Sequence, residues 1–170
     1  MNYQEPKNFE DILKLQAILD SNINNKRERT LRDIKLSLIA EIIEFNEETK
    51  ESHKTWKSKE INKEKELEEL TDIYFFYAQL INHNLDTDAD YESLKHLIAV
   101  DFENWQVKHR ESKCLPTLVL IDSIINNSSV YAISNLMEIT QKLGYTKDDI
   151  LNCYWTKWQK NMLRIGKEWN

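Results

Sequence analysis

The stretches LIAEIIEF (residues 38–45) and LEELTDIYFF (residues 67–76) each place two acidic residues three positions apart within an apolar pattern of helical period. Because positions i and i+3 are neighbours on an α-helix, the two acids of each pair lie on one side of it. Both pairs flank the apolar stripe that the helix must bury. The acids, with twenty-four residues between the pairs, are Glu41 and Glu44, then Glu69 and Asp72.

A carboxylate held against apolar surface is costly unless something pairs with it, and four that converge from two helices repel one another. Mg²⁺ resolves both problems because it prefers oxygen ligands and neutralises charge. The sequence therefore predicts a Mg²⁺ site, with Mn²⁺ as a substitute, made by Glu41, Glu44, Glu69 and Asp72. The alternative is that such pairs arise by chance on solvated faces, since the chain has 29 acidic residues. Six other acids in mixed Lys/Glu runs are expected to form a solvated face of this kind: Glu47, Glu48, Glu51, Glu64, Glu66 and Glu68.

The composition favours a single all-α domain over residues 1–170, a helical bundle of six to seven helices. Glycine and proline number two each, 41% of residues are hydrophobic and 31% are charged. Asn8 is expected to cap the first helix, and Thr30 with Asp33 and Thr146 with Asp149 resemble capping boxes that open two later ones. The predicted helices cover residues 9–23, 31–51, 60–84, 91–110, 118–125 and 128–143, with a last one that opens at 146 and extends to about 165.

Composition also limits the compartment and the partners. The N-terminus lacks the basic and apolar regions of a signal peptide, and no run of eighteen apolar residues predicts a membrane span. Cys114 and Cys153 are isolated and fit free thiols in a reducing cytoplasm. A net charge of −6 argues against nonspecific binding of nucleic acid. The segment 85–90 superficially resembles a calcium loop, but it lacks the glycine and the final glutamate of one and is expected to be a turn.

Three further groups could take part in binding. Trp56 stands between lysines outside any apolar stripe, so it either stacks on a base or packs its connection onto the core. Gln16 and Asp20 lie one turn apart on the first helix, where the plain reading is a polar flank. On one side of the last helix lies a possible clamp for a polyphosphate, with a solvated basic face as the alternative: Lys157, Asn161 and Arg164.

The spacing of the four acids resembles the all-α nucleoside triphosphate pyrophosphatases, which include the MazG-like proteins and the dimeric dUTPases. Within that superfamily the chain looks like a dimeric dUTPase of the kind found in phages and some protozoa. The residues that favour this branch are Leu15-Gln16 with Leu19-Asp20, Trp56-Lys57, and the frame Lys157…Asn161…Arg164. It departs from the usual motifs at Asp20, commonly Asn, and at Trp158 and Ile165, which replace Asn and Gln.

The resemblance implies Mg²⁺-dependent hydrolysis of dUTP, and of dUDP, to dUMP with release of pyrophosphate or phosphate, by water that attacks the β-phosphorus. It implies that Glu41 is the candidate base and that Lys57, Lys157 and Arg164 offset phosphate charge. Gln16, Asp20, Trp56 and Asn161 would contact the nucleotide. It further implies a cytoplasmic homodimer, in the host cytoplasm if phage-encoded, with a rigid core at residues 9–84 and 128–168. A mobile insert at residues 85–127 would close over the nucleotide.

Three alternatives remain beside this interpretation. One is a MazG-like hydrolase of other or damaged nucleotides, which differs in base preference. Another is a non-catalytic acidic helical protein that binds a repressor or another protein, a role that can coexist with catalysis in phage dUTPases. A di-iron carboxylate bundle is disfavoured because it needs Glu-x-x-His pairs, and no histidine in the chain has a glutamate three residues before it.

Overall fold

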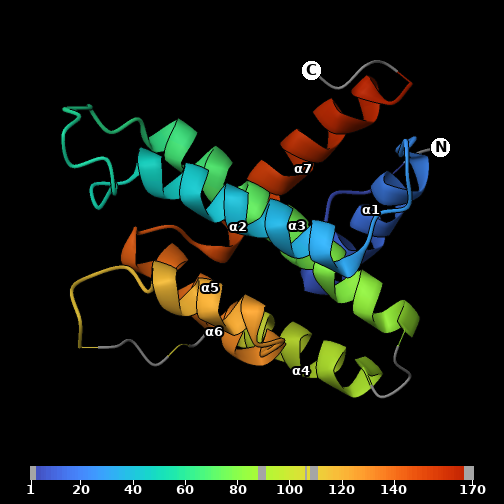
Figure 1. The fold of residues 1–170 in the computed structure, drawn as a ribbon. Helices are drawn as coiled ribbons and strands as arrows, with labels where there is room; N and C mark the ends of the chain where they lie inside the picture. Colours follow the sequence, from blue (N-terminus) through green and yellow to red (C-terminus); the bar gives the residue numbers. More distant parts are fainter. Residues whose placement is uncertain (1–2, 88–90, 106, 108–110, 167–170) are drawn as a thin grey trace.

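The computed structural model describes residues 3–87, 91–105, 107 and 111–166, and these residues form seven α-helices and no strand (Figure 1). The predicted all-α fold and the number of helices are confirmed. In chain order the helices are α1 (Phe9–Asn22), α2 (Leu31–Glu48), α3 (Lys63–Thr87), α4 (Tyr91–Asn104), α5 (Thr117–Ile125), α6 (Ser129–Lys142) and α7 (Lys147–Arg164).

The long helices α2 and α3 lie side by side at the centre of the bundle, and α3 contacts most of the others (Figure 1). The helices α1 and α7 pack against α3 on one side. The helices α4 and α5 pack on α6, and α5 also reaches α2. One continuous core joins all seven helices, and its largest fully buried side chains are Trp158, Tyr74, Tyr77, Tyr154, Phe9, Phe45 and Phe102.

The predicted caps are confirmed. The side chain of Asn8 accepts a hydrogen bond from the backbone N–H of Asp11 at 2.9 Å. Capping boxes open α2 and α7 at the predicted positions. Gly144 follows the end of α6 with φ +86°, a left-handed conformation that glycine adopts without strain. These local signals determine where the helices begin and end.

Four predicted boundaries are wrong. The helix α2 ends at Glu48 rather than near residue 51, because the hydroxyl of Thr49 donates to a backbone carbonyl and accepts from the N–H of Glu51. The helix α3 begins at Lys63 and continues through residues 85–87, which were expected to be a turn. The helix α4 ends at Asn104. Residues 88–90 of the predicted turn and residues 106 and 108–110 of the predicted fourth helix lie outside the described residues.

Two acids expected on a solvated face are buried instead. Glu48 is 6% exposed and forms ion pairs with Lys59 and Lys65. Glu66 is 1% exposed and pairs with Lys63. Because a buried carboxylate needs such partners, Glu48 ties the end of α2 both to Lys59 of the connection and to Lys65 of α3, and the pair of Glu66 with Lys63 lies within α3.

Candidate active site

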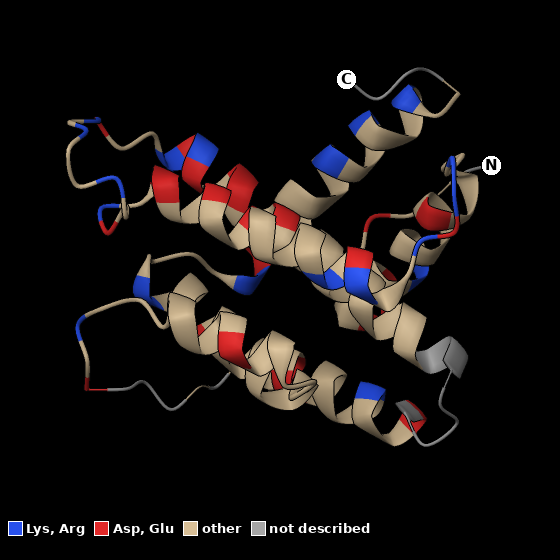
Figure 2. Cartoon of the chain, viewed as in Figure 1, with Lys and Arg blue, Asp and Glu red and all other residues tan. Residues whose placement is uncertain are grey.

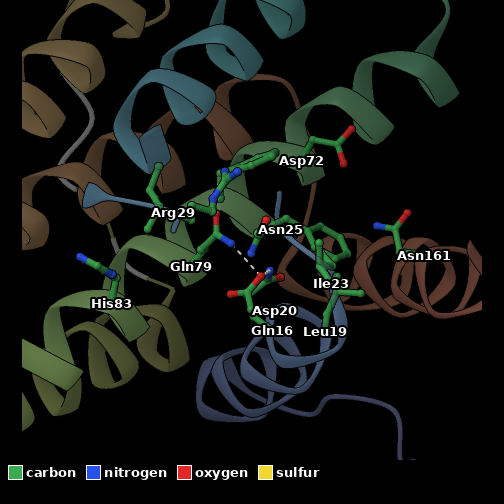
Figure 3. A pocket seen from close by; sticks show the side chains of 13 residues that line it. Gln16, Leu19, Asp20, Ile23, Asn25, Arg29, Asp72, Gln79, His83 and Asn161 are labelled. Carbon is green, nitrogen blue, oxygen red and sulfur yellow. Dashed lines mark hydrogen bonds between the residues drawn. The ribbon is translucent and has the colours of Figure 1, made fainter. Parts of the chain in front are cut away.

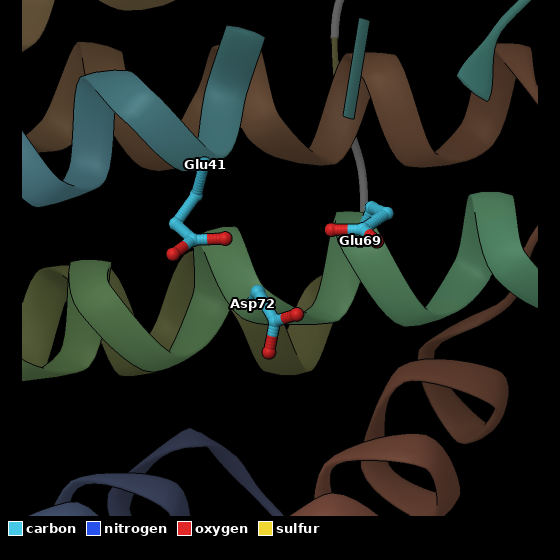
Figure 4. Close-up of side chains that lie close together, drawn as sticks. All are labelled: Glu41, Glu69 and Asp72. Atoms are coloured by element: carbon cyan, nitrogen blue, oxygen red, sulfur yellow. The ribbon is translucent and has the colours of Figure 1, made fainter. Parts of the chain in front are cut away.

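Three of the four predicted acids come together where α2 packs on α3. Oxygens of Glu41, Glu69 and Asp72 all lie within 4.8 Å of one another (Figure 4). Glu41 projects from α2, and the other two project from successive turns of α3. Each is partly buried. This acidic cluster brings three hard oxygen donors to the spacing that a divalent cation can bridge.

Glu44, the fourth predicted acid, is exposed on the next turn of α2 and is not one of these three. Its charge still acts on the cluster, because it is one of the groups that raise the pKa of Glu41. Figure 2 shows acidic residues on adjoining turns of α2 and α3 and basic residues at intervals along α7. Glu44 therefore lies at the edge of the cluster, within reach of its field.

The electrostatics of the cluster favour the binding of a cation. Burial is the main cause that raises the pKa of Glu41 to about 7. The charges of Asp72, Glu44 and Glu69 raise it further, and Lys157 opposes them. Burial likewise raises the pKa of Asp72 and of Glu69. Burial and mutual repulsion disfavour the negative charges of these carboxylates. A bound metal ion would relieve that repulsion.

Lys157 of α7 is the internal counter-ion of the cluster. Its Nζ donates to Oδ2 of Asp72 at 2.5 Å and to the backbone carbonyl of Glu68 at 3.1 Å. The alternative of a solvated basic face is therefore wrong for this lysine, whose side chain is only 17% exposed. The helix α7 thus contributes a positive charge beside the acids of α2 and α3.

A pocket of about 410 Å³ opens next to the acidic cluster and shares Asp72 with it (Figure 3). Its apolar walls include Leu19, Phe75 and Phe76, which suit the faces of a planar ring. The polar side chains that line it are Gln16, Asp20, Asn25, Arg29, Asp72, Gln79, His83 and Asn161.

Three of the predicted nucleotide contacts lie in this pocket, namely Gln16, Asp20 and Asn161. Gln16 is buried, and its Nε2 donates to Oδ1 of Asp20 at 2.8 Å. Burial raises the pKa of Asp20 to about 6, against the hydrogen bonds it accepts. Gln16 is therefore buried rather than part of a solvated flank, and both residues line the pocket.

The other predicted contacts lie elsewhere in this protomer. Trp56 is 74% exposed in the connection between α2 and α3, so it does not pack that connection onto the core. Lys57 lines a separate surface pocket with Lys50, Lys54 and Lys59. Arg164 is exposed in the last turn of α7 and is absent from the pocket lining. Within one chain the structure does not bring these three to the acids.

The two departures from the C-terminal motif, Trp158 and Ile165, both have a structural role at the end of the chain. Trp158 is a core residue: its Nε1 donates to the carbonyl of Leu15 at 2.8 Å, and its ring stacks on Trp155. It therefore fastens α7 to α1 rather than facing the pocket. Ile165 caps the end of α7 and packs against the core.

Four polar residues that line the pocket were not predicted from the sequence, namely Asn25, Arg29, Gln79 and His83. Gln79 follows Asp72 by seven positions, two helical turns, so its place on the same face was available from spacing. Arg29 lies in the non-helical segment before α2, where no periodic signal exists. Its side chain reaches Gln79 on α3 and Ser37 on α2.

Comparisons with known proteins agree with this geometry. The model of a family described as dUTPase matches residues 8–169, nearly the whole chain. A search of curated proteins gave no match. None of the helices in the described part of the chain is both long enough and apolar enough to cross a membrane.

Proposed function

The chain belongs to the dUTPase family and hydrolyses dUTP, and from that premise we propose that it does so with Mg²⁺ held by Glu41, Glu69 and Asp72, and with Glu44 at the edge of the site. The observation that carries this proposal is the acidic cluster, three carboxylates with oxygens within 4.8 Å of one another beside a pocket with apolar walls. The donors fit the ion, because they are hard oxygens whose crowding favours a divalent charge. Mn²⁺ would fit the same donors.

In the proposed reaction the oxygen of a water molecule forms a bond to the β-phosphorus, and the bond from that phosphorus to the α–β bridging oxygen breaks. The products are dUMP and pyrophosphate from dUTP, and dUMP and phosphate from dUDP. When bound, Mg²⁺ neutralises phosphate charge and activates water. Glu41 accepts the proton of the attacking water, a role that suits the acid that α2 presents opposite the two acids of α3.

The other residues of this chain position the substrate. Lys157, already beside Asp72, offsets charge on the phosphates. Gln16 and Asp20 hold the base in the pocket, and Asn161 contacts the sugar or the α-phosphate at the wall nearest α7. The segment at residues 85–127 closes over the nucleotide in this proposal, although Ile98, Phe102, Leu120 and Ile124 of that segment belong to the common core.

A homodimer would bring Trp56, Lys57 and Arg164 into use. All three lie outside the pocket of their own protomer. The exposed indole of Trp56 is available for contact with a second protomer or its nucleotide. Apolar side chains of α2 and α5 also gather on one surface groove, among them Ile43, Val119 and Leu118, the last of which is 80% exposed. Exposed apolar patches of this kind are typical of protein interfaces.

The dimer has its own test. Leu118→Glu should lower the mass in light scattering toward the 20.3 kDa of one chain. Leu97→Glu, at an exposed position on α4, is the matched control and should leave the mass unchanged. A wild-type protein that stays monomeric at every concentration contradicts the proposed dimer.

The test of the whole proposal is release of pyrophosphate from a panel of nucleoside triphosphates, with and without Mg²⁺. We expect turnover of dUTP that needs the ion and falls by about 100-fold or more in Glu41→Gln. Glu64→Gln, an exposed acid on α3, is the control and should turn over at the wild-type rate. Undiminished turnover in Glu41→Gln, or in the presence of a chelator, overturns the metal and base roles.

A further inference from the structure

A chain of hydrogen bonds along the wall of the pocket connects Arg29 to Asp20 through Gln79 (Figure 3). The Nε of Arg29 donates to Oε1 of Gln79 at 3.0 Å. The Nε2 of Gln79 donates to Oδ1 of Asp20 at 2.7 Å. Gln16 donates to the same carboxylate oxygen from the other side at 2.8 Å. Two amides thus converge on one oxygen of Asp20.

The orientation of the Gln79 amide is fixed by Arg29. A guanidinium group has donors and no acceptor, so the atom of Gln79 that faces it must be the carbonyl oxygen. Arg29 is itself held, because its Nη2 donates to Oγ of Ser37 at 3.1 Å and its guanidinium lies 5.6 Å from the ring centre of Phe76. The NH₂ of Gln79 therefore always points at Asp20.

The orientation of the Gln16 amide is not fixed in this way. Its Oε1 accepts from the hydroxyl of Tyr154 at 3.0 Å, but a hydroxyl can either donate or accept. That hydroxyl also lies 3.3 Å from the carbonyl oxygen of Ile12, which could take its proton instead. Gln16 can turn over without losing a partner, so Gln79 alone is a fixed donor to Oδ1 of Asp20. A hydrogen bond donated to one oxygen of a carboxyl group favours its ionised form, in which Oδ2 also accepts.

We propose that Gln79, oriented by Arg29, is a positioning residue that keeps Asp20 a hydrogen-bond acceptor toward the pocket, and that it thereby makes the pocket select a base with a ring N–H. This rests on the proposed placement of the base in the pocket. Oδ1 of Asp20 is occupied by the two amides, which leaves Oδ2 for the ligand. Uracil presents N3–H, which can donate to Oδ2 of Asp20. Cytosine has an acceptor lone pair at N3, so two acceptors would face each other.

The same arrangement predicts that the preference depends on pH. Burial raises the pKa of Asp20 to about 6, and the hydrogen bonds from Gln16 and Gln79 and the charge of Arg29 lower it against that trend. A protonated Asp20 can donate to N3 of cytosine, so the preference for uracil should weaken below pH 6. Besides Asp20, the titratable and charged groups that line the pocket or face Asp20 from the neighbouring elements are Arg29, Asp72, His83 and Tyr154.

The experiment compares the dissociation constants of dUMP and dCMP by calorimetry, without metal, between pH 5 and pH 8. For the wild type we expect dUMP to be preferred at pH 8 and the preference to fall about tenfold toward pH 5. Gln79→Met keeps the volume but removes the donor. It should reduce the preference at pH 7 about tenfold and move the midpoint of the pH dependence upward, because Asp20 then holds its proton more strongly.

Three variants make the outcome decisive. Asp20→Asn should abolish the pH dependence, and His83→Gln should leave it in place. Asn25→Trp, at an exposed position of the pocket wall, should weaken both nucleotides equally by filling the pocket. If Asn25→Trp changes nothing, the base lies elsewhere and the proposed placement fails together with this inference. If Asn25→Trp weakens binding but Gln79→Met leaves preference and midpoint unchanged, the positioning role of Gln79 alone is overturned.

Discussion

The ammonium of Lys157 lies 2.5 Å from Oδ2 of Asp72, so the last helix of the chain places a positive charge against the acids of the two central helices. This contact links the C-terminal motif to the acidic pairs in three dimensions. In the proposed site a metal ion would compete with Lys157 for the carboxylate of Asp72. Removal of the Lys157 charge should therefore strengthen metal binding and slow turnover.

Lys157→Met should bind Mn²⁺ more tightly in the absence of nucleotide, by about tenfold, because a competing cation has been removed. The same change should lower turnover of dUTP by about 100-fold, since charge on the phosphates is then less well offset. Paramagnetic resonance of free Mn²⁺ and pyrophosphate release measure the two effects. Lys160→Met, an exposed position on the same helix, should change neither. Weaker Mn²⁺ binding in Lys157→Met would contradict the competition.

Metal-free protein should lose stability as the pH rises from about 4.5 to 7. The pKa of Glu41 is raised to about 7 in the folded state by burial and by neighbouring acids. The folded protein therefore binds more protons than the unfolded chain in this window, and its free energy of unfolding falls as those protons leave. We expect a loss of about 1 to 2 kcal/mol, below the full linkage value because the carboxyl keeps some contact with water.

Urea unfolding at pH 5 and pH 8 in the presence of a chelator measures this loss. Glu41→Gln should remove most of it, and Mg²⁺ should restore stability to the wild type at pH 8. Glu64→Gln should retain the full pH dependence. A wild-type protein that grows more stable over the same range would show that the acids of the cluster are not held in repulsion.

Tyr145→Phe should destabilise the protein by about 1 to 3 kcal/mol. The hydroxyl of Tyr145 donates to Oε1 of Glu66 at 2.8 Å, and that carboxylate is 1% exposed, so the substitution removes a partner from a buried charge. The free energy of unfolding in urea gives the value. Tyr131→Phe, on an exposed tyrosine of α6, should be neutral. Equal stability of both variants would mean that Lys63 alone satisfies Glu66.

Trp56→Ala should leave the free energy of unfolding within about 0.5 kcal/mol of the wild type, because the indole is 74% exposed. A tryptophan in the core would cost about 3 to 5 kcal/mol on the same change. The KM for dUTP should rise about tenfold if the indole stacks on the base. Tyr131→Ala should change neither quantity. An unaltered KM would leave Trp56 without a role in binding.

The starts of α1, α2 and α7 and three of the four clustered acids were predictable from the sequence because both depend on short-range spacing. Asn8, Thr30 and Thr146 cap their helices through residues three positions away, and such contacts are visible in the sequence. The end of α2 was misplaced because the hydroxyl of Thr49 ends the helix through local hydrogen bonds. The hydrophobic periodicity of the sequence does not reveal such bonds.

Contacts that depend on the tertiary fold were not predictable. Glu48 and Glu66 stand in a run of mixed charges and look solvated, yet the packing of the α2–α3 connection buries them among lysines. The contact between Arg29 and Gln79 joins residues fifty positions apart, one of them outside any helix. No periodicity connects such residues, so only the fold shows that they share a wall of the pocket.

The pocket and the acidic cluster have one side chain in common, Asp72, and otherwise draw on different segments of the chain. Chemistry and recognition are therefore nearly separate modules. If the base binds in the pocket as proposed, substitutions at the pocket positions Asp20, Asn25 and Gln79 should change the preferred base more than the rate of hydrolysis. For protein engineering, libraries confined to that wall offer a route from a dUTP hydrolase to enzymes that clear other nucleotides.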